Sequence, residues 1–118
     1  MKIGSIVVKC NKFDKMLAFW QEALHYVPSA PAKDGWVILR DPEGRNPNIS
    51  LDKARDKERL GSTRFPRLHL DFYTDNQEGE VKRLLGIGAT RHPQTYDPED
   101  DFIVLKDPDG NLFCVVQT

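Results

Sequence analysis

His69 is the residue whose type and surroundings could do chemistry most directly. It lies in the strand-like run Leu68–Thr74, where alternation puts His69, Asp71 and Tyr73 on one face. The opposite, apolar face suits the underside of a helix. Imidazole titrates at about 6.5 when unperturbed, which suits general acid or base catalysis. Residues two apart on a strand lie about 7 Å apart, so Asp71 could orient His69 only if both side chains leaned together. The alternative is a hydrogen-bonded histidine with no catalytic role.

The chain has two cysteines, Cys10 and Cys114. Cys114 is interpreted as a small buried hydrophobic residue. The alternative is a nucleophile, for which the sequence shows no neighbouring base. Two thiols and no recognisable secretory signal predict a reduced, cytoplasmic setting rather than a disulfide framework.

Two further strand-like runs could line a binding site. Each run places an aromatic residue, an aliphatic residue and a cation on one face. These residues are Trp36, Ile38 and Arg40 in the first run, and Phe102, Val104 and Lys106 in the second. Aromatic rings on such a face suit a planar or apolar ligand. The two cations could bind a carboxylate or could simply be solvated strand ends.

The elements that position these residues are organised around a repeated turn. Asp41–Gly44 and Asp107–Gly110 both read Asp-Pro-acid-Gly, each after a β-rich run and a basic residue. The Asp accepts from nearby backbone N–H groups, Pro presets φ, and Gly takes the positive φ that closes the corner. The repeat predicts two hairpins and two copies of one unit.

Each half reads as strand, helix and then three strands. Asn11 with Asp14, and Asp75 with Glu78, are predicted N-caps of the two helices. The expected strands of the first half are Ile3–Lys9, a short strand without assigned bounds, Trp36–Arg40 and Asn48–Leu51. Those of the second half are Leu68–Thr74, Ala89–His92, Phe102–Lys106 and Leu112–Gln117. The predicted organisation is one domain: a module over about 1–52, a linker over about 53–66 and a module over about 67–118. A helix would cover one face of each sheet, and the open faces would form a cleft.

Composition limits the possible partners. The net charge is −1 and acidic and basic residues are interleaved in the predicted linker, so nucleic acid and anionic membrane are not expected partners. The apolar run Ile3–Val8 is too short to span a membrane. An apolar content of 39% is ordinary for a soluble globular protein.

Several motifs together resemble the vicinal oxygen chelate superfamily, and within it the glyoxalase-like and bleomycin-resistance-like single-domain proteins. The motifs are Leu17–Trp20 with Leu24, the His-bearing run Leu68–Asp75, Gly88–Thr90, and Asp107–Asn111. The resemblance implies an α+β fold, the glyoxalase/bleomycin resistance/dihydroxybiphenyl dioxygenase fold. Its two βαβββ modules would form curved mixed sheets around a cleft, with the helices outside.

The resemblance also implies a divalent metal held by one residue from each of four strands. The equivalent positions here are Ser5, Ser50, His69 and Cys114, of which only His69 keeps the residue type of the family. Neutral hydroxyls replace imidazole and carboxylate poorly as ligands. No cofactor and no complete family metal site are therefore expected. Ni, Zn, Mn or Fe bound through other residues stays open, because Asp52 or Asp71 could join His69 and Cys114.

Three functions follow as hypotheses. The first is binding of a small aromatic or apolar molecule without the family metal, as in bleomycin-resistance members. The second is a metal-dependent lyase, isomerase or dioxygenase, and the third is a metal-free enzyme with His69 as acid or base. The predicted contacts are His69, Trp36, Ile38, Arg40, Ser50, Asp71, Tyr73, Phe102, Val104, Lys106 and Cys114. A homodimer is also expected, because each half is short and exposes sheet edges.

Overall fold

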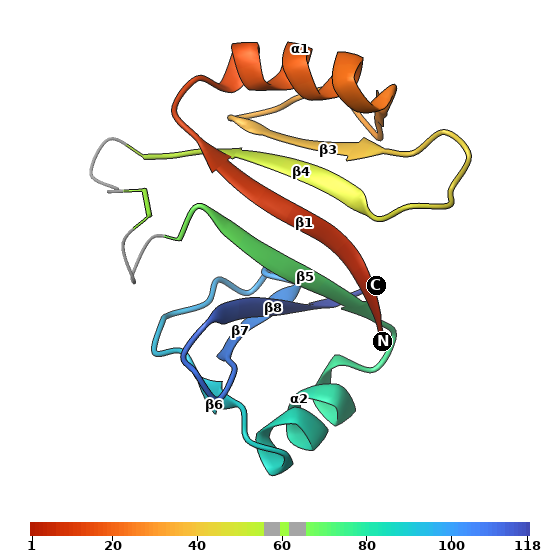
Figure 1. Ribbon diagram of the computed structural model, residues 1–118. Helices are drawn as coiled ribbons and strands as arrows, with labels where there is room; N and C mark the ends of the chain where they lie inside the picture. The colour runs from red at the N-terminus through yellow and green to blue at the C-terminus, as the bar shows by residue number, and fades with distance from the viewer. Residues whose placement is uncertain (56–59, 62–65) are drawn as a thin grey trace. The chain divides into compact units, whose positions relative to one another are not determined.

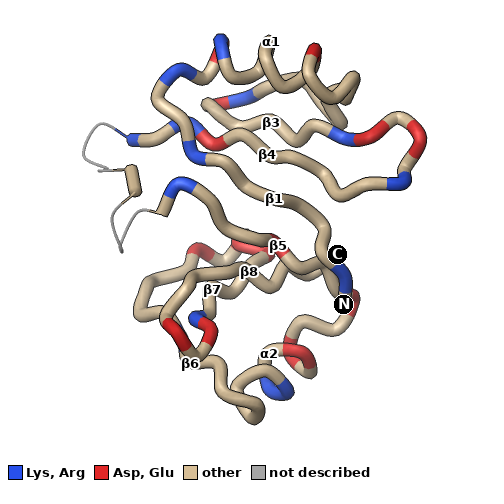
Figure 2. Tube along the Cα trace, viewed as in Figure 1, with Lys and Arg blue, Asp and Glu red and all other residues tan. Residues whose placement is uncertain are grey.

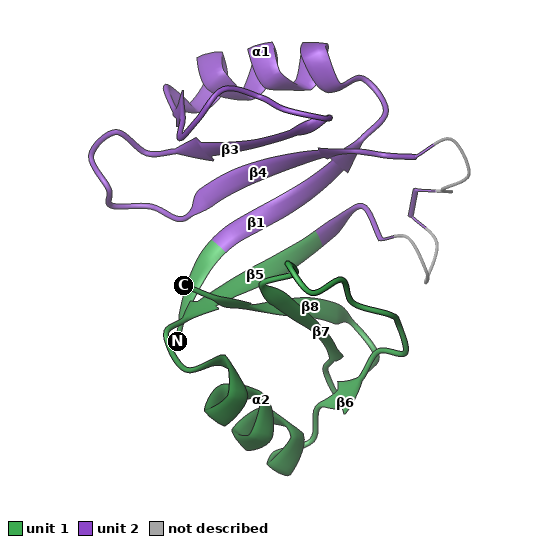
Figure 3. Ribbon diagram, turned by 180° about the vertical axis from the view of Figure 1, so that it is seen from behind, with its two compact units in different colours: residues 1–4, 69–118 green, residues 5–68 purple. Residues whose placement is uncertain are grey.

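The computed structural model describes residues 1–55, 60–61 and 66–118. Their contacts divide the chain into two compact units (Figure 3). The N-terminal unit is Ser5–Leu68, and the C-terminal unit is Met1–Gly4 together with His69–Thr118. Most of the predicted linker lies outside the described residues.

The N-terminal unit holds one helix on a small mixed sheet (Figure 1). Its strands are β1 (Lys2–Cys10), β2 (Val27–Pro28), β3 (Trp36–Arg40) and β4 (Asn48–Lys53), in the order β2-β3-β4-β1. β1 runs parallel to β4, and the other neighbours are antiparallel. Only Lys2–Gly4 of β1 belongs to the other unit.

Helix α1 (Phe13–Leu24) covers the apolar face of this sheet. Phe13, Met16, Leu17 and Trp20 recur at helical spacing and pack on a core of Cys10, Val37, Leu39 and Leu51. Phe19 lies off that stripe and is 59% exposed. The stripe therefore fixes which sheet face is covered and which residues lie on the other.

The C-terminal unit repeats the pattern. Its strands are β5 (Leu68–Thr74), β6 (Thr90–Arg91), β7 (Phe102–Lys106) and β8 (Leu112–Gln117), in the order β5-β8-β7-β6. β5 runs parallel to β8, as β1 does to β4. Helix α2 (Gln77–Gly86) packs Val81 onto Leu105 and Val115. The predicted α+β class with two βαβββ modules is confirmed.

Both repeated turns form as predicted. Asp41 Oδ1 and Oδ2 accept from the backbone N–H groups of Glu43, Arg45 and Asn46 at 2.9 to 3.2 Å. Asp107 Oδ1 accepts in the same way from Asp109 and Asn111, at 3.0 and 2.9 Å. Gly44 and Gly110 take φ values of 68° and 88°, where a side chain would be strained. These turns set the register of the two hairpins.

The helix starts correct the predicted caps by one residue. α1 begins after Lys12, with no side-chain cap, so Asn11 does not cap it. α2 is capped by Asn76, whose Oδ1 accepts from Gly79 N–H at 3.2 Å, in place of Asp75. The first helix therefore has no side-chain cap, and the cap of the second is the residue next to the predicted one.

Candidate functional site

His69, Asp71 and Cys114 form a cluster on β5 and β8 of the C-terminal unit. Asp71 and Cys114 are register partners, and His69 precedes Asp71 by two residues. His69 Nε2 lies 3.3 Å from Asp71 Oδ1, with side-chain exposures of 19% and 12%. The two side chains do lean together, which strand spacing alone argues against. The ligand atoms of all three residues lie within 4.8 Å of one another.

The Cys114 thiol is held in its protonated form. Burial raises the pKa of Cys114 well above its ordinary value, and the Asp71 carboxylate, which accepts the thiol hydrogen, raises it further. A thiol with a raised pKa is a weak nucleophile at neutral pH. Cys114 is half-buried, so the structure does not give it the full burial that was expected from the sequence.

The other two family-equivalent positions, Ser5 and Ser50, meet in the N-terminal unit. Their Oγ atoms are hydrogen-bonded at 2.6 Å, and both residues are fully buried. Ser5 Oγ also donates to the Asn48 carbonyl oxygen at 3.3 Å. The pair ties β1 to β4 on the sheet face opposite α1.

The remaining predicted contacts of the N-terminal unit lie on that same face. Ile38 is the register partner of Ser50, and Trp36 is the partner of Asp52. Trp36 is 37% exposed, and Arg40 at the strand end is also exposed. The face therefore presents an indole ring and an aliphatic side chain beside a buried hydroxyl pair.

The predicted contacts of the C-terminal unit also share one face. Val104 is the register partner of Cys114, and Phe102 and Lys106 lie two residues to either side of it. On the opposite face Phe72 packs against Phe113 with ring centroids 5.5 Å apart. That apolar face was expected to lie under a helix, but Leu68 is 60% exposed and Leu70 is 36% exposed.

Two contacts beside the face that carries His69 and Cys114 were not predicted from the sequence, namely those of Gly4 and of Tyr96. The Tyr73 ring lies where a Cβ on Gly4 would be, so the missing side chain of Gly4 makes room for the ring. Tyr96 Oη accepts from Val104 N–H at 2.9 Å, and its ring lies edge-on to Phe102. Neither contact has a local sequence signal, because both join residues from separate elements.

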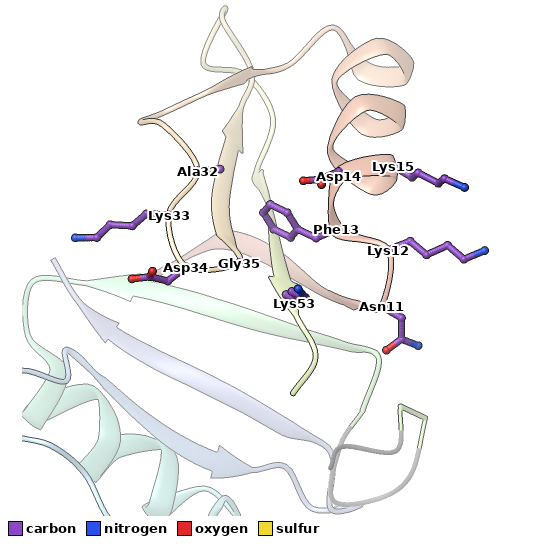
Figure 4. Close-up of a pocket in the computed structure, with 10 residues that line it drawn as sticks. All are labelled: Asn11, Lys12, Phe13, Asp14, Lys15, Ala32, Lys33, Asp34, Gly35 and Lys53. Carbon is purple, nitrogen blue, oxygen red and sulfur yellow. The ribbon is translucent and has the colours of Figure 1, made fainter. Parts of the chain in front are cut away.

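A surface pocket lies elsewhere in the N-terminal unit, between the start of α1 and the turn at Asp34–Gly35 (Figure 4). Its charged lining residues are Lys12, Asp14, Lys15, Lys33, Asp34 and Lys53. None of its lining residues is a predicted site residue. Figure 2 shows that both signs of charge occur on each unit.

A family model described as a glyoxalase-like domain matches residues 5–116. The chain belongs to the glyoxalase-like domain family. The matched range includes both hydroxyl positions, the His69 cluster and both repeated turns. Proteins with curated descriptions gave no significant match.

Solved structures share the fold at low identity. A glyoxalase/bleomycin resistance protein/dioxygenase superfamily member from Vibrio splendidus 12B01 is 13% identical over 97% of each chain, with a TM-score of 0.63. Methylmalonyl-CoA epimerase from Mycobacterium tuberculosis is 16% identical over 98% of this chain and 87% of that one (TM-score 0.71). The Streptomyces coelicolor epimerase in complex with 2-nitronate-propionyl-CoA is 14% identical, over 100% and 97% (TM-score 0.66). Such likenesses show the fold alone.

The four family-equivalent positions of this glyoxalase-like chain do not fit the family metal. Two of the four are buried serines whose hydroxyls bond each other, and a neutral hydroxyl is a poor ligand for a divalent transition metal. These four positions therefore offer no ligand set for a metal-dependent step. Among the described residues, no helix is long and apolar enough to cross a membrane.

Proposed function

We propose that this glyoxalase-like protein binds a small aromatic or apolar organic molecule, without the complete metal site of its family. The observation that carries the proposal is the Ser5–Ser50 hydrogen bond. The hydroxyls at two of the four family-equivalent positions are hydrogen-bonded to each other, with an Oγ–Oγ distance of 2.6 Å, and neither residue is exposed to solvent. A binding protein does not need a Lewis acid at those positions, whereas the family's metal-dependent reactions do.

The side chains beside these positions support an apolar ligand. Trp36 and Ile38 flank Ser50 across β3 and β4, and Phe102 and Val104 lie beside Cys114 across β7 and β8. Aromatic rings bring large apolar contact areas with few rotatable bonds. Arg40 and Lys106 stand at the strand ends, where either could bind a carboxylate of the ligand.

The test starts from the protein purified under native conditions. Native mass spectrometry should detect one small molecule per binding site, which is then identified and returned to protein stripped of it. Binding should change the fluorescence of Trp36, so the change should persist in Trp20→Phe and disappear in Trp36→Phe. Trp20 is the matched control, since it belongs to α1 and packs against the core on the other face of the sheet. A fluorescence change that depends on Trp20 alone would argue against the proposed site.

A second candidate function rests on the closeness of His69 and Asp71. A carboxylate oxygen 3.3 Å from an imidazole nitrogen can orient the ring for general acid or base catalysis. Under this candidate the protein is a metal-free enzyme. His69→Gln separates the two candidates. In a binding protein the wild type converts nothing, and the variant keeps its affinity within a few fold. In an enzyme the wild type converts the bound molecule, and the variant still binds it but no longer converts it.

A further inference from the structure

We infer that His69, Asp71 and Cys114 form a zinc-binding site within the C-terminal unit, with Asp71 as the third ligand. The site uses two family-equivalent positions and one residue that is not at such a position. It requires neither Ser5 nor Ser50. The inference goes beyond the proposed function and does not depend on it, because the site needs no organic ligand.

The distances suit one small cation. Zinc binds nitrogen and oxygen at about 2.0 to 2.2 Å and thiolate sulfur at about 2.3 Å, so tetrahedral ligands lie about 3.3 to 3.8 Å apart. His69 Nε2 and Asp71 Oδ1 are already 3.3 Å apart. All three ligand atoms fall within 4.8 Å, so a modest rotation of the side chains brings them to zinc distance.

The backbone holds these positions in register. Asp71 and Cys114 are partners in the parallel β5–β8 pairing, and β8 is paired on its other side with β7. His69 lies on the same face of β5 two residues earlier. Donors carried by paired strands are held more firmly than donors on loops. Little rearrangement is therefore needed for binding.

The donor types favour zinc among the common divalent ions. Thiolate is a soft ligand, imidazole suits zinc, and carboxylate completes a set of three protein ligands with a fourth position open. Thiolate and carboxylate together carry two negative charges, which match the charge of Zn²⁺. The thiol hydrogen that Asp71 accepts in the metal-free protein is released to the buffer when the cation takes its place.

Cobalt titration tests the site directly. The full-length protein is treated with a chelator, dialysed and titrated with Co²⁺, which reports its ligands through its absorption spectrum. The expected result is one Co²⁺ per chain, with a thiolate-to-cobalt charge-transfer band and the strong visible bands of tetrahedral cobalt. Zn²⁺ should displace the Co²⁺ stoichiometrically.

Four variants assign the ligands. Cys114→Ser should remove the charge-transfer band, while Cys10→Ser, which changes the other thiol, should keep it. Asp71→Asn preserves the shape of the side chain and should weaken Zn²⁺ binding by at least about 100-fold, since even outer-shell partners cost about 10- to 100-fold. The double variant Ser5→Ala/Ser50→Ala should bind as the wild type does, because it alters only the two hydroxyl positions. Circular dichroism checks the fold of each variant.

A measurement on the unaltered chain covers the case in which a variant does not fold. At an alkaline pH at which the metal-free thiol is alkylated, Zn²⁺ should protect Cys114, and peptide mass spectrometry distinguishes Cys114 from Cys10. The inference is overturned if the wild type binds no Co²⁺ at micromolar concentrations. It is equally overturned if the charge-transfer band survives in folded Cys114→Ser, or if Asp71→Asn binds Zn²⁺ as tightly as the wild type.

Discussion

The position of the Asp71 side chain shows that the geometry of the candidate site depends on individual rotamers. Asp71 lies two residues after His69 on β5, and it is the register partner of Cys114 on the neighbouring strand β8. Strand periodicity puts all three residues on one face, but periodicity does not set rotamers. Their convergence to within 4.8 Å therefore had to come from the structure.

The turn aspartates give a prediction at the same scale. Hydrogen bonds from the Asn111 side chain and backbone, and from the backbone N–H groups of Asp109 and Gly110, lower the pKa of Asp107. A carboxyl whose pKa is lower in the folded state stabilises the protein above its unfolded pKa. That contribution disappears as pH falls through the folded pKa. Asp107→Asn should therefore lower the free energy of unfolding at pH 7. The difference from the wild type should become smaller as the pH falls from about 5 to the lowered pKa.

Urea unfolding at several pH values measures this difference. Asp109→Asn is the matched control, because Asp109 contributes its backbone N–H to the same turn. If Asp107→Asn and Asp109→Asn lower stability equally at pH 7, the accepting carboxylate is not what holds the turn.

At the scale of elements, the buried hydroxyl pair predicts an unequal effect of two similar substitutions. Ser50→Ala leaves Ser5 Oγ its bond to the Asn48 carbonyl, so a loss of about 1 kcal/mol is expected. Ser5→Ala leaves the buried Ser50 Oγ without the partner that the structure gives it, which costs about 1 to 3 kcal/mol.

The double variant completes the cycle. Ser5→Ala/Ser50→Ala should lose less stability than the two single variants together, by about 1 kcal/mol, because neither hydroxyl is then left alone. Chemical denaturation of the four proteins supplies the numbers. Strict additivity would mean that the two hydroxyls do not stabilise the β1–β4 pairing through each other.

The start of β1 gives a second prediction for an element. A Cβ on Gly4 would overlap the Tyr73 ring, so Gly4→Ala forces the ring out of place and should cost about 1 to 3 kcal/mol. Gly86→Ala at the end of α2 is the matched control, since nothing lies within 4 Å of its added Cβ. It should be neutral or slightly stabilising.

A second background isolates the cause. In Tyr73→Ala the ring is gone, so adding Gly4→Ala should cost little more. Thermal unfolding of the single and double variants gives both differences. A full penalty for Gly4→Ala in the Tyr73→Ala background would show that the backbone of β1, and not the ring, requires glycine.

Most strands could be predicted from the sequence, whereas the helix caps and some side-chain contacts could not. The bounds of β3, β5, β7 and β8 agree with the sequence, because alternation and Asp-Pro-x-Gly turns are local signals. The predicted caps were wrong for different reasons: Asn76 caps α2 in place of its neighbour Asp75, whereas α1 begins without a side-chain cap. The Gly4–Tyr73 and Tyr96–Val104 contacts carry no local signal at all.

At the scale of the whole molecule, the repeated turn predicted two modules because it recurs with the same flanking pattern. The two units do share one topology: in each, the first strand runs parallel to the last and the helix covers one face. A repeat in the sequence predicts the order of strands and helix within each module. It says nothing about how copies of the chain assemble, which depends on exposed side chains far apart in the sequence.

A homodimer remains a prediction at this scale. Several large apolar side chains are well exposed, among them Phe19 at 59%, Leu68 at 60% and Ile87 at 68%. A stable interface of standard size buries about 800 Å² per partner and would cover some of them. A two-fold interface uses the same patch on both copies, so one substitution introduces two charges into the interface. We therefore expect sedimentation equilibrium at micromolar concentration to give about twice 13.5 kDa.

Single substitutions then locate the interface. Phe19→Glu, Leu68→Glu and Ile87→Glu each place a charge on one exposed apolar position, and the variant that falls to the mass of one chain marks the buried patch. Lys82→Glu is the control, because it changes charge at an exposed polar position of α2. Burying two carboxylates in an apolar contact costs several kcal/mol, far more than a rim charge does. A wild-type mass that stays at 13.5 kDa across the whole concentration range would rule out the dimer.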